Sequence, residues 1–262
     1  MSLALLLPAV FLIAVFMTLA GRGGGNFYVL LCVLAGAGMH QAAATGQLIM
    51  CATSVAALLV FQKHKNVAWP MAVFLGLTAS TMAFVGGFFA HLISGPALKL
   101  VFGSLLVVAS LLMLFPLSEA KDAETRSGLG IWTFRAGGAL IRVNLWLAVP
   151  LSLLTGLFAG MVGVSGGSFL IPLMVLACRM PMKLAVGTAA VMVGATAGMG
   201  FLGHLVKGGV ELAGVAPLAL VAVVGGLIGG KWAIASKPKA LKLIFALTTM
   251  AAAVLMFINA LL

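Results

Sequence analysis

Apolar residues form long runs along the chain, separated by short polar or glycine-rich segments. The runs predict helices near residues 3–20, 27–39, 42–62, 67–92 and 97–116 and, after a polar segment, near 145–164, 169–179, 183–205, 211–235 and 239–260. A helix needs about 20 residues to cross a hydrocarbon core about 30 Å thick. The second run of each group is too short for that. The pattern therefore predicts two groups of five helices, each with a broken or re-entrant helix in second place.

A constant offset of 143 residues aligns 23–115 with 166–258 without a gap. The aligned identities include Gly23 with Gly166, Gly24 with Gly167, Thr45 with Thr188, Thr53 with Thr196, Gly86-Gly87 with Gly229-Gly230, and Ala97–Leu100 with Ala240–Leu243. Apolar composition alone would match some leucines and alanines, but not these glycine pairs, threonines and a lysine. The chain therefore contains an internal repeat, which is typical of membrane transporters.

Composition assigns the chain to the bilayer. Of its 262 residues, 63% are hydrophobic and 7% are charged, whereas about 25% of the residues in a soluble domain are charged. The runs are longer than the roughly 10-residue alternating segments of an outer-membrane barrel, so we expect an all-α integral membrane protein. No basic residue precedes the first run, and the second half has an equivalent run, so we expect residues 1–20 to be a helix and not a removable leader.

The net charge of +11 is better explained by basic loops that orient a membrane protein than by nucleic-acid binding, which we do not expect. Suppose that the first two helices of each half return the chain to the side from which it entered. Lys99 and Lys207 then lie on one side, Arg22 lies at a glycine loop, and the remaining basic residues gather on the other side: Lys63, Lys65, Lys121, Arg126, Arg135, Arg142, Arg179, Lys183, Lys231, Lys237, Lys239 and Lys242.

Parallel halves would divide these residues about evenly, so the bias favours two inverted repeats, 1–116 and 145–262. Both termini are then outside the cytoplasm and the 117–144 linker is inside. The linker holds Glu119, Asp122 and Glu124. Within it, we expect 131–142 to form an amphipathic stretch on the membrane interface.

Two glycine-rich loops precede the short helices and are the predicted substrate site. The site residues are Arg22, Gly23, Gly24, Gly25, Asn26, Ser165, Gly166, Gly167 and Ser168. Irregular backbone inside a membrane protein is tolerated where it lines a cavity or binds a ligand. The N–H groups that begin each short helix attract an anion, and glycine lets the backbone approach a ligand closely.

Arg22 has two interpretations. Its guanidinium costs at least about 2.5–3.5 kcal/mol in hydrocarbon, which a bound anion would offset, and this favours a place in the site. The alternative is that Arg22 extends from the end of the first helix to the membrane interface. The residue aligned with it in the second half is Ser165.

A second layer of polar residues follows at the third helix of each half, where we predict a pathway or gates. Its members are His40, Gln41, Thr45, Thr53, Lys183, Thr188 and Thr196. His40 and Lys183 equally suit interface positions at helix ends, and the threonines equally suit bonds to their own helices.

The predicted spans lack carboxylates, and Glu211 suits a helix start. Coupling to a proton or a sodium ion would thus depend on a histidine such as His91 or His204, on the substrate's own proton, or on backbone carbonyls. Both histidines also suit plain packing positions.

No catalytic, metal or cofactor motif is present. HExxH and a Walker loop are missing, and Cys32, Cys51 and Cys178 stand singly in apolar runs. We therefore expect no enzyme, no metal and no cofactor.

The second half contains Gly156-Leu-Phe-Ala-Gly-Met-Val-Gly-Val-Ser-Gly-Gly-Ser-Phe-Leu-Ile-Pro172, followed by Met180-Pro181 and Ala185-Val-Gly-Thr188. This pattern resembles the TauE/SafE sulfite exporter family. The first half carries a weaker form, Ala20-Gly-Arg-Gly-Gly-Gly25, with Val29 in place of the usual proline. The resemblance implies a bacterial inner-membrane permease that exports sulfite, sulfonates or related organosulfur anions.

We therefore expect a secondary transporter of a small anion that works by alternating access. The alternatives are a passive anion channel and a non-transporting scaffold subunit. The expected partners are the anion and the lipid bilayer, and self-association into a homo-oligomer is left open.

Overall fold

The computed structural model describes residues 3–92, 95–114, 129–164, 166–207 and 215–261. The first half folds into α1 (Leu3–Leu19), α2 (Gly25–Leu34), α3 (Met39–Lys63), α4 (Trp69–Phe89) with the 3₁₀ turn η1 (Ala90–Leu92), and α5 (Gly95–Leu114). The second half folds into α6 (Leu145–Val162), α7 (Gly167–Pro172) with the π-helical turn η2 (Leu173–Ala177), α8 (Met182–Lys207), α9 (Val215–Ala235) and α10 (Pro238–Leu261). The predicted all-α membrane class is confirmed, and its helices lie within a few residues of their expected positions.

Six of the helices that the structure describes are long and apolar enough to cross a membrane: α3, α4, α6, α8, α9 and α10. The short helices in second place are also confirmed. Helix α2 has 10 residues, and α7 with η2 covers only Gly167–Ala177. At 1.5 Å per residue each is about 15 Å long, half of a hydrocarbon core.

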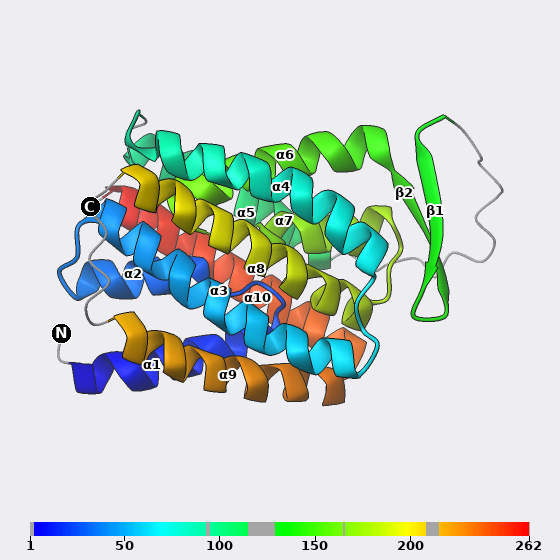
Figure 1. Cartoon of the computed structure of the whole chain (residues 1–262), viewed down its shortest axis with the longest axis horizontal. Helices are drawn as coiled ribbons and strands as arrows, with labels where there is room; N and C mark the ends of the chain where they lie inside the picture. The colour runs from blue at the N-terminus through cyan, green and yellow to red at the C-terminus, as the bar shows by residue number, and fades with distance from the viewer. Residues whose placement is uncertain (1–2, 93–94, 115–128, 165, 208–214, 262) are drawn as a thin grey trace.

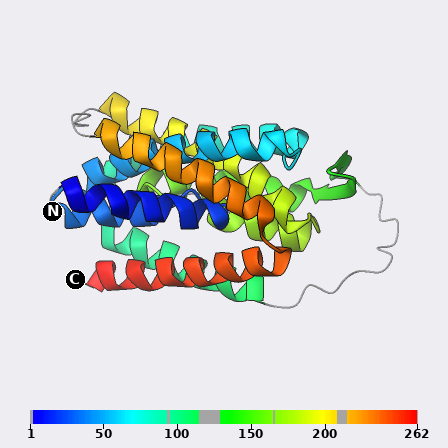
Figure 2. The same ribbon diagram turned by 90° about the horizontal axis from the view of Figure 1, so that it is seen from below.

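Each half begins with a helical hairpin that turns at its glycine loop. In Figure 1, α1 enters from the end where both chain termini lie, and α2 runs back toward that end. Helix α6 enters from the opposite end, beside the two β-strands, and α7 runs back toward them. Figure 2 shows the same separation, with the termini at one end and the strands at the other. The first hairpins of the two halves thus enter from opposite ends.

The packing partners also correspond between the halves. Helix α4 packs against α6 and α8, and its counterpart α9 packs against α1 and α3. Helix α3 contacts its counterpart α8, and α5 contacts its counterpart α10. Helices α3 and α8 occupy the centre, since 67% and 72% of their most apolar stretches are buried, against 33–44% for the other long helices.

Residues 131–144 differ from expectation. They form a β-hairpin of β1 (Ile131–Ala136) and β2 (Ala139–Asn144), where no strands were predicted. Gly137 and Gly138 form the two-residue turn with φ of +57° and +79°, as a type I′ turn requires. Ile141 and Val143 are fully buried in the main core, so the hairpin covers one end of the bundle. The preceding linker residues, 117–128, lie outside the described residues.

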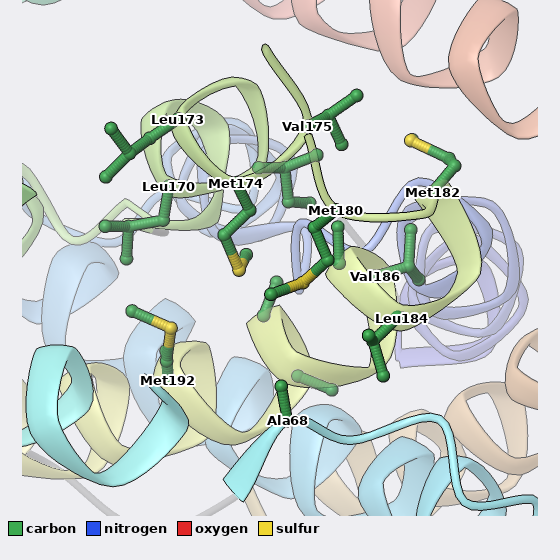
Figure 3. Packing of buried hydrophobic residues seen from close by; sticks show 14 of the residues in the cluster. Ala68, Leu170, Leu173, Met174, Val175, Met180, Met182, Leu184, Val186 and Met192 are labelled. Carbon is green, nitrogen blue, oxygen red and sulfur yellow. The ribbon is translucent and has the colours of Figure 1, made fainter. Parts of the chain in front are cut away.

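A methionine-rich core holds the second broken helix in place. Figure 3 shows Leu170, Met174 and Val175, from α7 and η2, beside Met180 and Met192, which come from the connection to α8 and from α8 itself. Methionine side chains are flexible and fill irregular gaps, which suits the irregular π turn at this point.

Candidate functional site

The two glycine loops touch each other in the middle of the molecule. A Cβ atom on Gly25 would lie 2.9 Å from the carbonyl oxygen of Gly163 and 3.0 Å from Cα of Val164. A Cβ on Gly167 would lie 3.0 Å from the carbonyl oxygen of Gly21. The loops therefore pack backbone against backbone, at a distance that only glycine allows.

The first loop also needs glycine for its conformation. Gly23 and Gly24 have φ of +71° and +81°, a region that other residues rarely adopt. Gly24 is the N-cap of α2, so the turn reverses the chain directly before the short helix. The N–H groups of the first turn of α2 consequently start at the contact between the loops.

Arg22 is buried at this contact, with 2% of its surface exposed. Its Nε donates a hydrogen bond of 3.0 Å to Oγ of Ser168 in the opposite loop. Its guanidinium carbon lies 5.8 Å from the centre of the Phe245 ring, within the range of a cation–π interaction. The structure thus places Arg22 inside the protein and not at an exposed helix end.

Several buried polar atoms near the loops lack a hydrogen-bond partner among the described residues. They are Nη1 of Arg22, both amide atoms of Asn26, Oγ1 of Thr18 and Oε1 of Gln47. Most buried polar groups in proteins are paired, so such a cluster calls for a functional or structural explanation. Unpaired donors on Arg22 and Asn26 suit a ligand that offers oxygen acceptors.

A cavity of about 10 Å³ adjoins the first loop. It is lined by Thr18, Gly21, Gly23, Ser54, Ala57, Phe61 and Ala190. This volume is about what one water molecule needs, so it is too small for an anion of several heavy atoms.

His40 and Lys183, which were predicted as gates, lie at opposite ends of the molecule. His40 is exposed in the first turn of α3, at the end of the bundle that holds the termini. Lys183 lies in the first turn of α8, at the β-hairpin end, where its Nζ donates to the carbonyl of Ile234 at 2.6 Å. Gln41 is half-buried next to His40. If these residues act as gates, they serve opposite ends of the molecule.

The threonines of α3 and α8 are buried. Thr53, Thr188 and Thr196 donate to carbonyls of their own helices, the alternative that the sequence left open. Thr188 also accepts the N–H of Ala68 at 3.0 Å, so it fixes the start of α4. Thr45 is buried as well, and Ser165 lies outside the described residues.

Sequence reasoning missed Gln47 and Tyr28. Nε2 of Gln47 donates to the carbonyls of Ala159 and Gly160, at 3.2 and 3.1 Å, and so connects α3 to α6. The hydroxyl of Tyr28 bonds with Thr53 at 3.1 Å, which ties α2 to α3. A polar side chain in an apolar helix is itself a signal, but neither residue has a polar counterpart in the other half.

The chain resembles proteins that are described as transporters. The sequence profile of the family "Sulfite exporter TauE/SafE" matches residues 6–256. A "Probable membrane transporter protein" of Xylella fastidiosa (strain 9a5c) is 28% identical over 211 residues, which cover 79% of this chain and 75% of that protein. The "Probable membrane transporter protein YunE" of Bacillus subtilis (strain 168) is 22% identical over 190 residues, 71% of this chain and 68% of the relative. No solved structure matches the chain.

The profile match spans nearly the whole chain, including both glycine loops, and the six long apolar helices agree with a multi-pass membrane transporter. The chain belongs to the TauE/SafE sulfite exporter family.

Proposed function

We propose that this protein is a secondary transporter that exports a small anion, such as sulfite, a sulfonate or a related organosulfur anion. The observation that carries the proposal is Arg22, a buried cation at the contact between the two glycine loops whose Nη1 has no hydrogen-bond partner among the described residues. A buried charge without a counter-charge is costly, and an anion bound between the loops would offset that cost.

The surroundings of Arg22 favour an anion over a cation. All four acidic residues of the chain lie outside the described residues, so no carboxylate in the described part competes for the guanidinium. Ser168 and Asn26 add polar side chains, and the N-terminus of α2 adds a positive helix-dipole end. Sulfite and sulfonates present several oxygen acceptors that match such a set of donors.

Alternating access is proposed from the relation between the halves. The hairpins α1–α2 and α6–α7 enter from opposite ends, and the packing partners exchange under the 143-residue offset. Both features support two inverted repeats, 1–116 and 145–262, around a central site. The cavity beside the first loop is about the size of one water molecule, and alternating access would have to enlarge it to admit an anion.

The orientation follows from the positive-inside rule. The described basic residues at the β-hairpin end belong to the ends of α3 and α9, the hairpin, the α7–α8 connection and the starts of α8 and α10. Among the described basic residues, only Lys99 and Lys207 lie at the other end, and Arg22 lies in the first glycine loop. The β-hairpin end is therefore proposed to face the cytoplasm of a bacterial inner membrane, with both termini on the periplasmic side.

Exchange of solutes in proteoliposomes tests the proposal. Purified protein would be screened by thermal shift against sulfite, sulfate, thiosulfate, taurine and sulfoacetate, and the stabilising anions would be used for counterflow. We expect saturable uptake that unlabelled anion inside the vesicles accelerates. A channel would give currents without counterflow, and a scaffold would give no flux, so either result would contradict a secondary transporter.

A further inference from the structure

His204 of α8 is a buried titratable side chain that the proposed anion site does not use. It is 6% exposed, and its Nε2 lies 3.0 Å from the carbonyl oxygen of Gly160 in α6. A carbonyl oxygen can only accept, so Nε2 must carry the hydrogen. In the neutral imidazole Nδ1 is then the atom with a free lone pair, and a proton would add there.

The same carbonyl binds a second side chain. Nε2 of Gln47 donates to Gly160 at 3.1 Å, so helices α3 and α8 both hold the C-terminal turn of α6. A Cβ on Gly200, one turn before His204, would lie 2.6 Å from the Gln47 amide nitrogen, which shows how closely α8 and α3 approach here. Oε1 of Gln47 is buried and unpaired within the described residues.

This cluster lies next to the glycine loops. Gly160 is three residues before Gly163, whose carbonyl would meet a Cβ on Gly25 at 2.9 Å. His204 is therefore bonded to the last turn of α6, directly before the second loop. The cluster lies toward the termini, since His204 is near the end of α8 and Gln47 is near the start of α3.

We propose that His204 is the proton-binding site that couples anion transport to the proton gradient, an inference that rests on the proposed function. A proton added to Nδ1 leaves the Nε2–H bond to Gly160 in place and creates a buried imidazolium. A buried charge is costly alone, and an anion at the adjacent loops would compensate it. Protonation of His204 would then raise the affinity for the anion, and the bound anion would raise the affinity of His204 for the proton by the same factor.

Among the described residues, few charged or titratable groups belong to the helices packed around His204. From α3, His40 interacts with it electrostatically, and Cys51 approaches α8 at Gly198. Helices α4, α6 and α7 contain no titratable residue, and His91 lies in η1 beyond α4.

The basic residues of α8 and α10 lie at different distances from His204. Lys207 follows three residues later, whereas Lys183 of α8 and the lysines of α10, Lys239 and Lys242, lie at the β-hairpin end. Arg22 lies in the first loop. No carboxylate lies among the described residues, and under the proposal the transported anion serves as the counter-charge of the imidazolium.

The test uses probe anions whose own charge stays constant, sulfate and methanesulfonate, between about pH 5 and 8, where histidine titrates. Binding to the purified protein is measured by calorimetry in buffers of different ionisation enthalpy, which counts the protons taken up. We expect the affinity to rise about tenfold or more from pH 8 to pH 5, with proton uptake on binding. His204→Gln keeps an amide donor for Gly160 but cannot titrate, so it should bind with little pH dependence.

His64→Gln is the matched control, because His64 is exposed at the opposite end of α3. It should keep the wild-type pH dependence. Coupling through His204 is wrong if His204→Gln also keeps it, or if the wild-type protein binds anions without taking up protons. The second criterion needs no variant, so it holds even if His204→Gln fails to fold. If no anion binds to the wild-type protein at any pH, the proposed function itself is wrong, and the coupling with it.

Discussion

Arg22 and Ser168 are 146 residues apart in the chain, yet Nε of Arg22 donates a 3.0 Å hydrogen bond to Oγ of Ser168. The bond joins the glycine loop of the first half to that of the second. It holds the Nε edge of the guanidinium, and Nη1 has no hydrogen-bond partner among the described residues. Arg22 is therefore held in place at the boundary between the two halves, where its guanidinium can bind an anion.

Ser168→Ala should weaken the protein in the absence of substrate. The change leaves a buried charged donor without its acceptor, which costs about 1–3 kcal/mol. We expect a lower thermal midpoint in detergent, measured by intrinsic fluorescence. Ser104→Ala is the control, because Ser104 is exposed and its hydroxyl donates to the carbonyl of Leu100 in its own helix. Equal midpoints for Ser168→Ala and Ser104→Ala would show that the bond between the loops contributes no stability.

Gly167→Ala should separate the two loops. The new methyl group would lie 2.8 Å from Cγ2 of Val193 and 3.0 Å from the carbonyl of Gly21, and overpacking of this kind costs about 1–3 kcal/mol. Both the thermal midpoint and counterflow should fall. Gly38→Ala meets no atom within 4 Å and should leave both unchanged. Wild-type stability of Gly167→Ala would contradict the close packing of the loops.

Ile141→Ala should loosen the β-hairpin. Ile141 is fully buried against the end of the bundle, and removing such a side chain costs about 2–5 kcal/mol. Leu140 is its neighbour in the same strand but is 54% exposed, so Leu140→Ala is a matched control. Protease cleavage near residue 130, followed by mass spectrometry, should be faster in Ile141→Ala only. Equal cleavage of the two variants would mean that the hairpin does not depend on this contact.

The proposed orientation can be read from single cysteines in a cysteine-free background. Ser236 is partly exposed between α9 and α10 at the β-hairpin end, and Gly38 is exposed before α3 at the other end. A membrane-impermeant maleimide added to intact cells should label Gly38→Cys, whereas Ser236→Cys should react only after the cells are opened. The reverse pattern would place the termini in the cytoplasm.

Much of the helical framework was readable from the sequence because the bilayer imposes it. Every spanning segment must be apolar and about 20 residues long, so the two short segments stand out by length alone. The repeat then indicated which loops correspond. That the loops contact each other could only be proposed, because the offset relates positions in the chain and does not fix distances.

The hairpin at 131–144 was missed although its signal was present. Gly137-Gly138 flanked by alternating apolar residues is typical of a two-residue β-turn. We instead predicted an amphipathic stretch on the membrane interface. The pairing of Gln47 and His204 with the carbonyl of Gly160 could not be predicted. It depends on how α3 and α8 meet α6, and neither side chain has a polar counterpart at the 143-residue offset.

The role of Arg22 is tested most directly by anion binding to variants at that position. Binding of the stabilising anion should be at least about tenfold weaker in Arg22→Ala, the loss of one charge-assisted contact. Arg22→Lys should restore part of the affinity, because it keeps the charge but not the planar donor set. Lys63→Ala removes an exposed charge at the β-hairpin end and should bind as the wild type does. Unchanged affinity in a folded Arg22→Ala protein would contradict an anion site at the contact between the two glycine loops.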